Sequence, residues 1–131
     1  MTLTAETVGL YAETLVRQVH AGGHTLDYTA ATLPLLDVLF EDVEEGFAAL
    51  PEAQQSLVVF YNGCYLGEVF VRSLGAQWQC VSPWFESTLI VATEQGGVQI
   101  RPFEKVLRRL TEGAEGNGLA AYFQGLTECL P

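Results

Sequence analysis

Four side chains between residues 61 and 72 have the types and spacing that could do chemistry. They are Tyr61, Tyr65, Glu68 and Arg72, and separations of four, three and four residues place them on one face of a helix. In a small pocket, Glu68 could orient a ligand or act as a general acid or base. The alternative is structural, because a buried Glu68 must be paired and Arg72 lies one turn away. The sequence leaves both interpretations open.

A second set of candidate ligands is His20, His24 and Asp27, whose donor atoms would suit a divalent metal. Gly22 and Gly23 separate the two histidines and break the helix that would hold both on one face. We therefore expect capping and surface roles for these residues, with no metal and no cofactor.

Nucleophilic catalysis and phosphate binding lack their defining residues. The chain has no Gly-x-Ser-x-Gly segment, and no glycine-rich loop is followed by Lys and then Ser or Thr. The cysteines Cys64, Cys80 and Cys129 are odd in number and form no Cys-x-x-Cys pair. We expect them to be buried thiols in a reducing compartment.

The sequence also lacks the patterns of membrane and exported proteins. No window approaches 18 uninterrupted apolar residues, and residues 1–13 show neither the basic nor the apolar part of a signal peptide. We therefore expect a cytoplasmic protein that does not associate with membranes.

The charge of the chain is strongly negative and unevenly distributed. The net charge is −10, and no Lys or Arg occurs between Arg17 and Arg72. Four cations lie close together nearer the other end: Arg101, Lys105, Arg108 and Arg109. Such a chain should be repelled by phosphate backbones, so we expect no binding of nucleic acid.

The cation-free interval contains the acidic residues of a helix predicted over residues 32–47. Glu41, Asp42, Glu44 and Glu45 lie in its middle and C-terminal half, where the helix dipole disfavours negative charge. These carboxylates could face a basic protein partner, or they could form a solvated surface that keeps the protein soluble.

Apolar residues three and four apart predict five helices, which cover residues 4–20, 32–47, 51–74, 103–113 and a segment from about 119. Thr4 is the expected N-cap of the first helix, and Gly75 is the expected end of the third. Segments rich in β-formers at 77–82, 87–93 and 98–102 predict a three-stranded antiparallel sheet, and residues 25–28 are expected to be extended.

Two positions in these elements suggest close packing or a binding role. Gly63 and Gly67 lie inside the long helix, where each lowers helix stability by about 1 kcal/mol relative to alanine. Their presence indicates that another element packs closely against that face. Trp84 follows Pro83 in a loop, where it could be an exposed anchor for a partner or could fold onto the core.

Several segments resemble a family of short bacterial proteins with no established activity. The matching segments are YAETLV, LDYTAATLPLLD, GCYLGEVFVRSLGAQW, PFEKVLRRLTEG and LAAYF, and the central one is the most specific. Phe70 stands where that family often has a basic residue, and Ala76 replaces a second glycine. The resemblance implies a shared fold and a region of interest around Tyr65, Glu68 and Arg72.

We therefore expect one α+β domain over residues 1–131, with a long central helix packed against the small sheet and about four further helices around them. The first function we expect is a non-enzymatic interaction module, of inhibitor or immunity type, that binds a basic partner. One alternative is a small-molecule-binding domain or enzyme that uses Glu68 and Arg72. The other is a structural homodimer, in which the acidic helix of one copy meets the basic helix of another.

Overall fold

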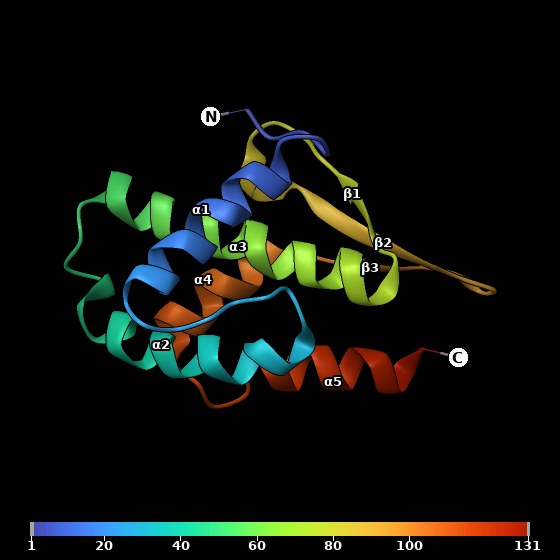
Figure 1. Cartoon of the computed structure of the whole chain (residues 1–131). Helices are drawn as coiled ribbons and strands as arrows, with labels where there is room; N and C mark the ends of the chain where they lie inside the picture. The colour runs from blue at the N-terminus through green and yellow to red at the C-terminus, as the bar shows by residue number, and fades with distance from the viewer. Residues whose placement is uncertain (1, 131) are drawn as a thin grey trace.

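The 23-residue helix α3 (Glu52–Leu74) runs through the middle of the molecule, as Figure 1 shows. The computed structural model describes residues 2–130. Pro51 precedes the first turn of α3, and the helix ends at Gly75, whose φ of +69° is a left-handed conformation that glycine adopts without strain. The run from Asn62 to Gly67 is buried, which confirms the prediction of a central helix.

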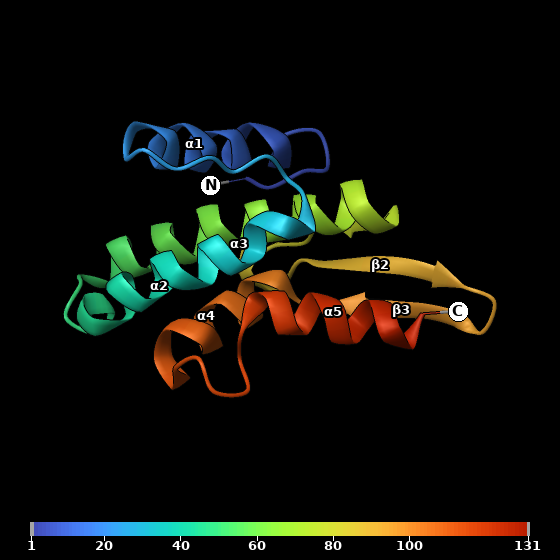
Figure 2. The ribbon, with the colours of Figure 1, turned by 60° about the horizontal axis from the view of Figure 1, so that its bottom comes forward.

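Four further helices surround α3. Helix α1 (Val8–Ala21) lies along one side of α3, and α4 (Pro102–Glu112) packs against another side (Figure 2). Helices α2 (Leu33–Phe47) and α5 (Leu119–Cys129) pack against each other and against α4. Two short 3₁₀ turns, η1 (Ala30–Thr32) and η2 (Trp84–Glu86), complete the helical part of the described chain.

Three antiparallel strands form a sheet in the order β1 (Gln77–Gln79), β2 (Thr88–Thr93) and β3 (Gly96–Ile100). Leu89 of β2 lies opposite Trp78 on one side and Ile100 on the other, so the three side chains share one face. Figure 1 shows the hairpin of β2 and β3 extending beyond the helices. The α+β fold with a long helix against a three-stranded sheet is therefore confirmed.

The two glycines inside α3 are sites of close approach by other elements. A Cβ atom at Gly63 would overlap the ring of Phe103 from α4, and one at Gly67 would overlap the indole of Trp78 from β1. The rings of Phe60 and Phe103 stack with centroids 6.1 Å apart beside this contact. The expectation of a packing role for both glycines is thus confirmed.

The start of the first helix differs from the prediction. Thr4 does not cap a helix that begins there; α1 begins at Val8 instead. The backbone N–H of Thr4 donates to Oγ1 of Thr7 (3.0 Å), and the N–H of Thr7 donates to Oγ1 of Thr4 (3.2 Å). These reciprocal bonds have the pattern of a capping box, so Thr4 caps the turn of residues 5–7 that leads into α1.

The remaining boundaries deviate by a few residues. Strand β1 stops at Gln79 rather than near 82, and β3 starts at Gly96 rather than 98, because Gly96 takes a φ of +120° at the hairpin turn. Among residues 2–130, no helix has the length and apolar character needed to cross a membrane.

Candidate functional site

The four side chains of the predicted stripe of α3 do not converge on one site, although Tyr65 and Arg72 both contact the ring of Tyr28. Tyr61 is half-buried and packs its ring edge-on against Phe60 and Tyr11, with centroids 5.5 and 6.4 Å away. Tyr65 is fully buried, whereas Glu68 is half-buried and Arg72 is exposed. Burial is therefore greatest at Tyr65 and decreases from there toward Arg72.

The hydroxyl of Tyr65 ties the segment before α2 to the central helix. It accepts a hydrogen bond from the backbone N–H of Tyr28 (3.0 Å) and lies 2.7 Å from Oγ1 of Thr32. Burial raises the pKa of Tyr65, so the hydroxyl keeps its proton over the neutral range. Tyr65 thus has a structural role in this arrangement.

Tyr28 occupies the centre of this region, although the sequence analysis did not select it. Its φ of +67° is left-handed, which costs a side-chain-bearing residue about 1–2 kcal/mol, so the expectation that 25–28 is extended is wrong at this residue. Its hydroxyl donates to Glu13 (2.6 Å), and the guanidinium of Arg72 lies 3.6 Å from its ring centroid. These contacts, with the Tyr65 bond, hold the strained backbone.

The predicted ion pair between Glu68 and Arg72 is not present. Within residues 2–130, no carboxylate–guanidinium contact of 4.0 Å or less joins the two. Glu68 instead accepts a hydrogen bond from the indole N–H of Trp78 (3.2 Å), which β1 brings against α3. The exposed Arg72 instead places its guanidinium over the ring of Tyr28.

Two of the segments that carry the resemblance meet in this region. Tyr28 belongs to the LDY segment, and its ring lies 5.1 Å from that of Tyr65 in the GCYLGEV segment. The pairing of these segments was a signal that could have selected Tyr28. Glu13 had the same kind of signal, because it belongs to the YAETLV segment of that resemblance.

A cluster that the sequence analysis did not identify lies between α2 and α4. Arg109 of α4 is completely buried, and it donates hydrogen bonds to the carboxylate of Glu44 and to the backbone carbonyl of Asp37 (3.1 Å). Its Nε lies 3.4 Å from Oδ1 of Asp37 without a hydrogen bond. A buried guanidinium needs such partners, since an unpaired charge in the interior is strongly unfavourable.

Asp37 extends this cluster to a third helix. Its two carboxylate oxygens accept hydrogen bonds from the backbone N–H groups of Leu119 (2.9 Å) and Ala120 (3.1 Å), at the start of α5. These groups have no acceptor within their own helix, so Asp37 caps α5 from α2. The acidic and basic helices therefore already meet within one chain, and Glu44, expected on a partner-facing surface, is used internally.

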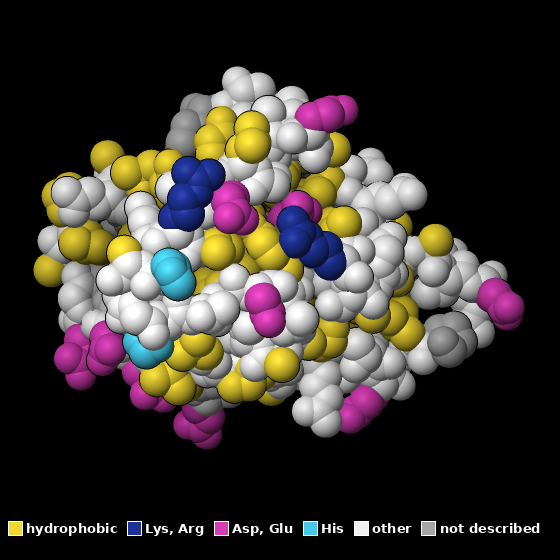
Figure 3. Space-filling model, in the orientation of Figure 1, with side chains coloured by type: hydrophobic (Ala, Val, Ile, Leu, Met, Phe, Trp, Pro, Cys, Tyr) yellow, Lys and Arg dark blue, Asp and Glu magenta, His cyan; other side chains and the backbone are white. Residues whose placement is uncertain are grey.

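The other acidic residues of α2 point outward. Glu41, Asp42 and Glu45 are exposed, and with the 55% exposed Val38 they follow a spacing of three, four and seven residues. No ion pair within 4.0 Å involves these three carboxylates in the described chain. Figure 3 shows acidic side chains gathered at the lower left of the view, over the C-terminal half of α2, with no Lys or Arg among them. We call Val38, Glu41, Asp42 and Glu45 the outer face of α2.

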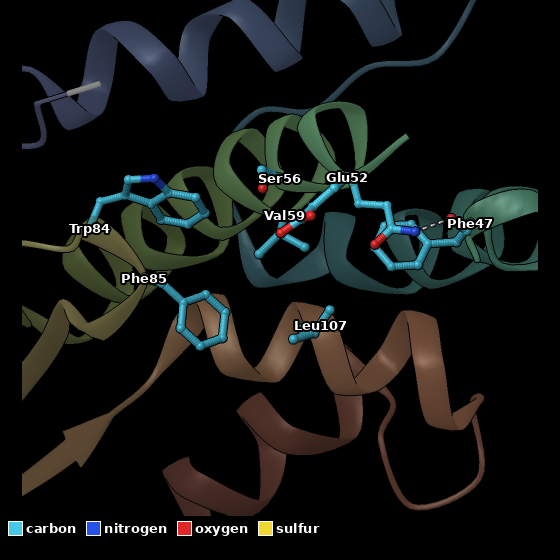
Figure 4. Close-up of a pocket in the computed structure, with 8 residues that line it drawn as sticks. Phe47, Glu52, Ser56, Val59, Trp84, Phe85 and Leu107 are labelled. Atoms are coloured by element: carbon cyan, nitrogen blue, oxygen red, sulfur yellow. Dashed lines mark hydrogen bonds between the residues drawn. The ribbon is translucent and has the colours of Figure 1, made fainter. Parts of the chain in front are cut away.

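A cleft of about 310 Å³ lies beside the end of α2 (Figure 4). Its walls come from α2, the start of α3, η2 and α4, and they consist of Phe47, Glu52, Gln55, Ser56, Val59, Trp84, Phe85 and Leu107. Trp84 is half-buried and packs edge-on against Phe60 and Phe103, each with centroids 4.9 Å apart. Of the two predicted positions for Trp84, it takes the one folded onto the core, while it also lines the cleft.

One polar side chain that lines this cleft has a structural role. The side-chain amide of Gln55 donates to the backbone carbonyls of Phe47 (3.0 Å) and Leu50 (3.1 Å), which fixes the turn between α2 and α3. The exposed Glu52 is the one carboxylate among the lining residues. The cleft thus combines aromatic walls with a single negative charge.

The histidines and cysteines form no reactive constellation in the described chain. His20 and His24 are exposed, and residues 2–130 contain no group of three His, Cys, Asp or Glu placed to hold a metal ion. Burial raises the pKa of the Cys64 thiol, which opposes formation of a thiolate. Cys129 is exposed, so the expectation that every cysteine is buried is wrong for that residue.

Comparison of the chain with protein-family models, with curated proteins and with solved structures gives no match. Function must therefore be inferred from the geometry described above.

Proposed function

We propose that this protein is a non-enzymatic interaction module that binds a basic protein partner through the outer face of α2. The observation that carries the proposal is the row of three exposed carboxylates that follows the exposed Val38 along one face of the helix. Exposed charges of one sign suit a partner surface of the opposite charge. A partner that presents Lys and Arg beside an apolar side chain would complement this row.

The position of these carboxylates supports the same proposal. Glu41, Asp42 and Glu45 lie in the second half of α2, where the helix dipole opposes negative charge. Their inward-pointing neighbours Asp37 and Glu44 offset that cost through Arg109. The outer three have no such partner within residues 2–130, so a cation from another molecule would supply the missing interaction.

The cleft beside Trp84 can serve the same partner. Phe47 at the end of α2 and Glu52 in the first turn of α3 both line it, so it adjoins the acidic helix. Aromatic rings with one carboxylate suit the alkyl stem and charged head of a Lys or Arg side chain. We propose that one basic side chain of the partner enters this cleft.

The alternatives have weaker support. An enzymatic or small-molecule site at Glu68 and Arg72 would need side chains free to act, but Trp78 binds one and Tyr28 stacks on the other. A homodimer built from α2 and α4 would have to use Arg101, Lys105 and Arg108, because Arg109 is already paired within its own chain.

The test is native mass spectrometry of the protein isolated at low salt from the cells that produce it. We expect a complex with a second, basic polypeptide that dissociates as the salt concentration rises, because exposed charges are screened by salt. A homodimer, or a bound small molecule without a second polypeptide, would contradict the proposal in favour of one of the alternatives.

A further inference from the structure

The cations of α4 and its N-cap differ in burial. Arg109 is buried, whereas Arg101 and Arg108 are exposed and Lys105 is half-buried. The spacing of four and three residues places Arg101, Lys105 and Arg108 close together along the helix. The whole chain has six Lys and Arg residues, so these three are half of its cations. Their concentration in one place stands out in a chain of net charge −10.

This face is hollowed where α4 meets the end of β3 and the start of α5. A cavity of about 200 Å³ is lined by Gln99, Arg101, Glu104, Lys105, Arg108 and Tyr122. It is smaller than the clefts of about 300 Å³ or more that hold drug-sized ligands, so it suits a small ligand.

Two of the cations lining the cavity have no anionic partner. Arg101 donates to the side-chain oxygen of Gln99 (3.3 Å), and Nζ of Lys105 lies 4.8 Å from the ring centroid of Tyr122. Neither cation has a carboxylate within 4.0 Å among residues 2–130. The charges of both are therefore available to a ligand.

The third cation is partly neutralised. Arg108 lies 3.1 Å from Glu104 and 3.9 Å from Glu112, in two pairs along its own helix. Since Glu104 also lines the cavity, the lining contains three cations and one carboxylate. An excess of positive charge remains among the lining residues.

The ionisation of Lys105 agrees with this excess. Burial and the nearby charge of Arg108 lower the pKa of Lys105 below its usual value. A bound anion would remove part of that repulsion, so it would stabilise the charged form of the lysine.

We propose that this cavity binds the oxyanion group of a small ligand, either a phosphate or a carboxylate. Arg101 and Lys105 supply the charge, and Arg and Lys together bind such groups through short, charge-assisted hydrogen bonds. Tyr122 supplies an aromatic wall for the rest of the ligand. A polyanion is excluded by the acidic remainder of the chain, which would repel it.

This site is separate from the proposed partner-binding surface. The lining of the cavity is mostly positively charged, whereas the outer face of α2 is negatively charged. The cavity shares no lining residue with that face or with the Trp84 cleft. Its test can therefore succeed or fail without affecting that proposal.

The experiment is an NMR titration of the isotope-labelled protein with inorganic phosphate, and separately with succinate, at constant ionic strength. We expect saturable shifts at the amides around Arg101, Lys105 and Tyr122. Saturation by phosphate alone would assign a phosphoryl ligand, and saturation by succinate would assign a carboxylate.

Three variants make the result specific. K105M keeps the alkyl stem over Tyr122 while removing the charge, and it should weaken phosphate binding about tenfold. E104Q should strengthen binding, because it removes the competing carboxylate. R17Q is the matched control: it removes an exposed cation from α1 and should leave the affinity unchanged.

Two results would overturn the proposal. Shifts that increase linearly with phosphate, and equally in K105M and R17Q, would show an adventitious ion only. Shifts at the cavity that depend on protein concentration, without added anion, would show that carboxylates of a second copy occupy it instead.

Discussion

The two sides of α2 carry the same kind of residue but use it differently. Asp37 and Glu44 point inward and hold the buried Arg109, while Glu41, Asp42 and Glu45 point outward without an internal partner. Three of these five carboxylates are thus not explained by the fold. The difference shows that the acidic residues of one helix can have two roles. Some stabilise the fold, and others form a surface that is available for binding.

The comparison would be tested most strongly by removing one inward charge. E44Q leaves the guanidinium of Arg109 with only the more distant carboxylate of Asp37, so we expect a loss of about 2–3 kcal/mol in the free energy of unfolding. E45Q, at the adjacent exposed position, should change it by less than about 0.5 kcal/mol. Urea denaturation measures both. Equal effects of the two variants would abolish the distinction between the faces.

Removing the buried hydrogen bond of Tyr65 should lower the free energy of unfolding by less than removing the charge of Glu44. Y65F removes the hydroxyl that accepts from the N–H of Tyr28, and we expect a loss of about 1–2 kcal/mol because a buried donor is left without its partner. Y61F is the control, since the half-buried Tyr61 contacts its neighbours through its ring. If thermal denaturation gave the two variants the same stability, the hydroxyl of Tyr65 would not hold the strained segment.

The stability at alkaline pH tests whether the protonated hydroxyl of Tyr28 stabilises the same region. Burial and the adjacent Glu13 raise the pKa of Tyr28 above its ordinary value of about 10. The unfolded chain therefore loses this proton at a lower pH than the folded protein does. The stabilisation is complete below about pH 10 and decreases above it, by at most about 1.4 kcal/mol per pH unit for one group.

Chemical denaturation between about pH 8 and pH 11 measures this decrease, and Y28F should reduce the part that Tyr28 contributes. An identical pH dependence in the wild type and Y28F would show that Tyr28 ionises equally in both states.

The smallest effect on stability is expected on the outer face. E41Q/D42Q/E45Q should change the free energy of unfolding by less than about 0.5 kcal/mol, or raise it slightly by removing repulsion near the end of the helix. Calorimetry would measure the change. A large destabilisation would mean that these residues have structural partners after all.

Local patterns were enough to predict the elements of this fold. Apolar spacing indicated the helices, Pro51 and Gly75 marked the ends of α3, and Gly63 and Gly67 indicated close packing. Contacts between distant segments were not predictable in the same way. Arg109 looks like any surface cation in the sequence, because its burial depends on how α2 and α4 pack.

The predicted site illustrates the same limit. Helical spacing placed Glu68 and Arg72 one turn apart. It could not show that Glu68 would bind Trp78 and that Arg72 would stack on Tyr28, so that the two do not pair with each other. The outer face of α2 was predictable in part, since charge and spacing selected Glu41, Asp42 and Glu45. Glu44 was selected with them wrongly, because its partner lies 65 residues away.

The central claim is that the outer face of α2 binds a basic protein. The most direct test is native mass spectrometry at low salt of three proteins isolated in parallel: the wild type, E41Q/D42Q/E45Q, and a control, E6Q/E94Q/E115Q, that removes three exposed carboxylates elsewhere. We predict that a basic polypeptide accompanies the wild type and the control but is lost from the α2 variant. Equal retention by all three proteins would contradict the claim, as would its absence from the wild type.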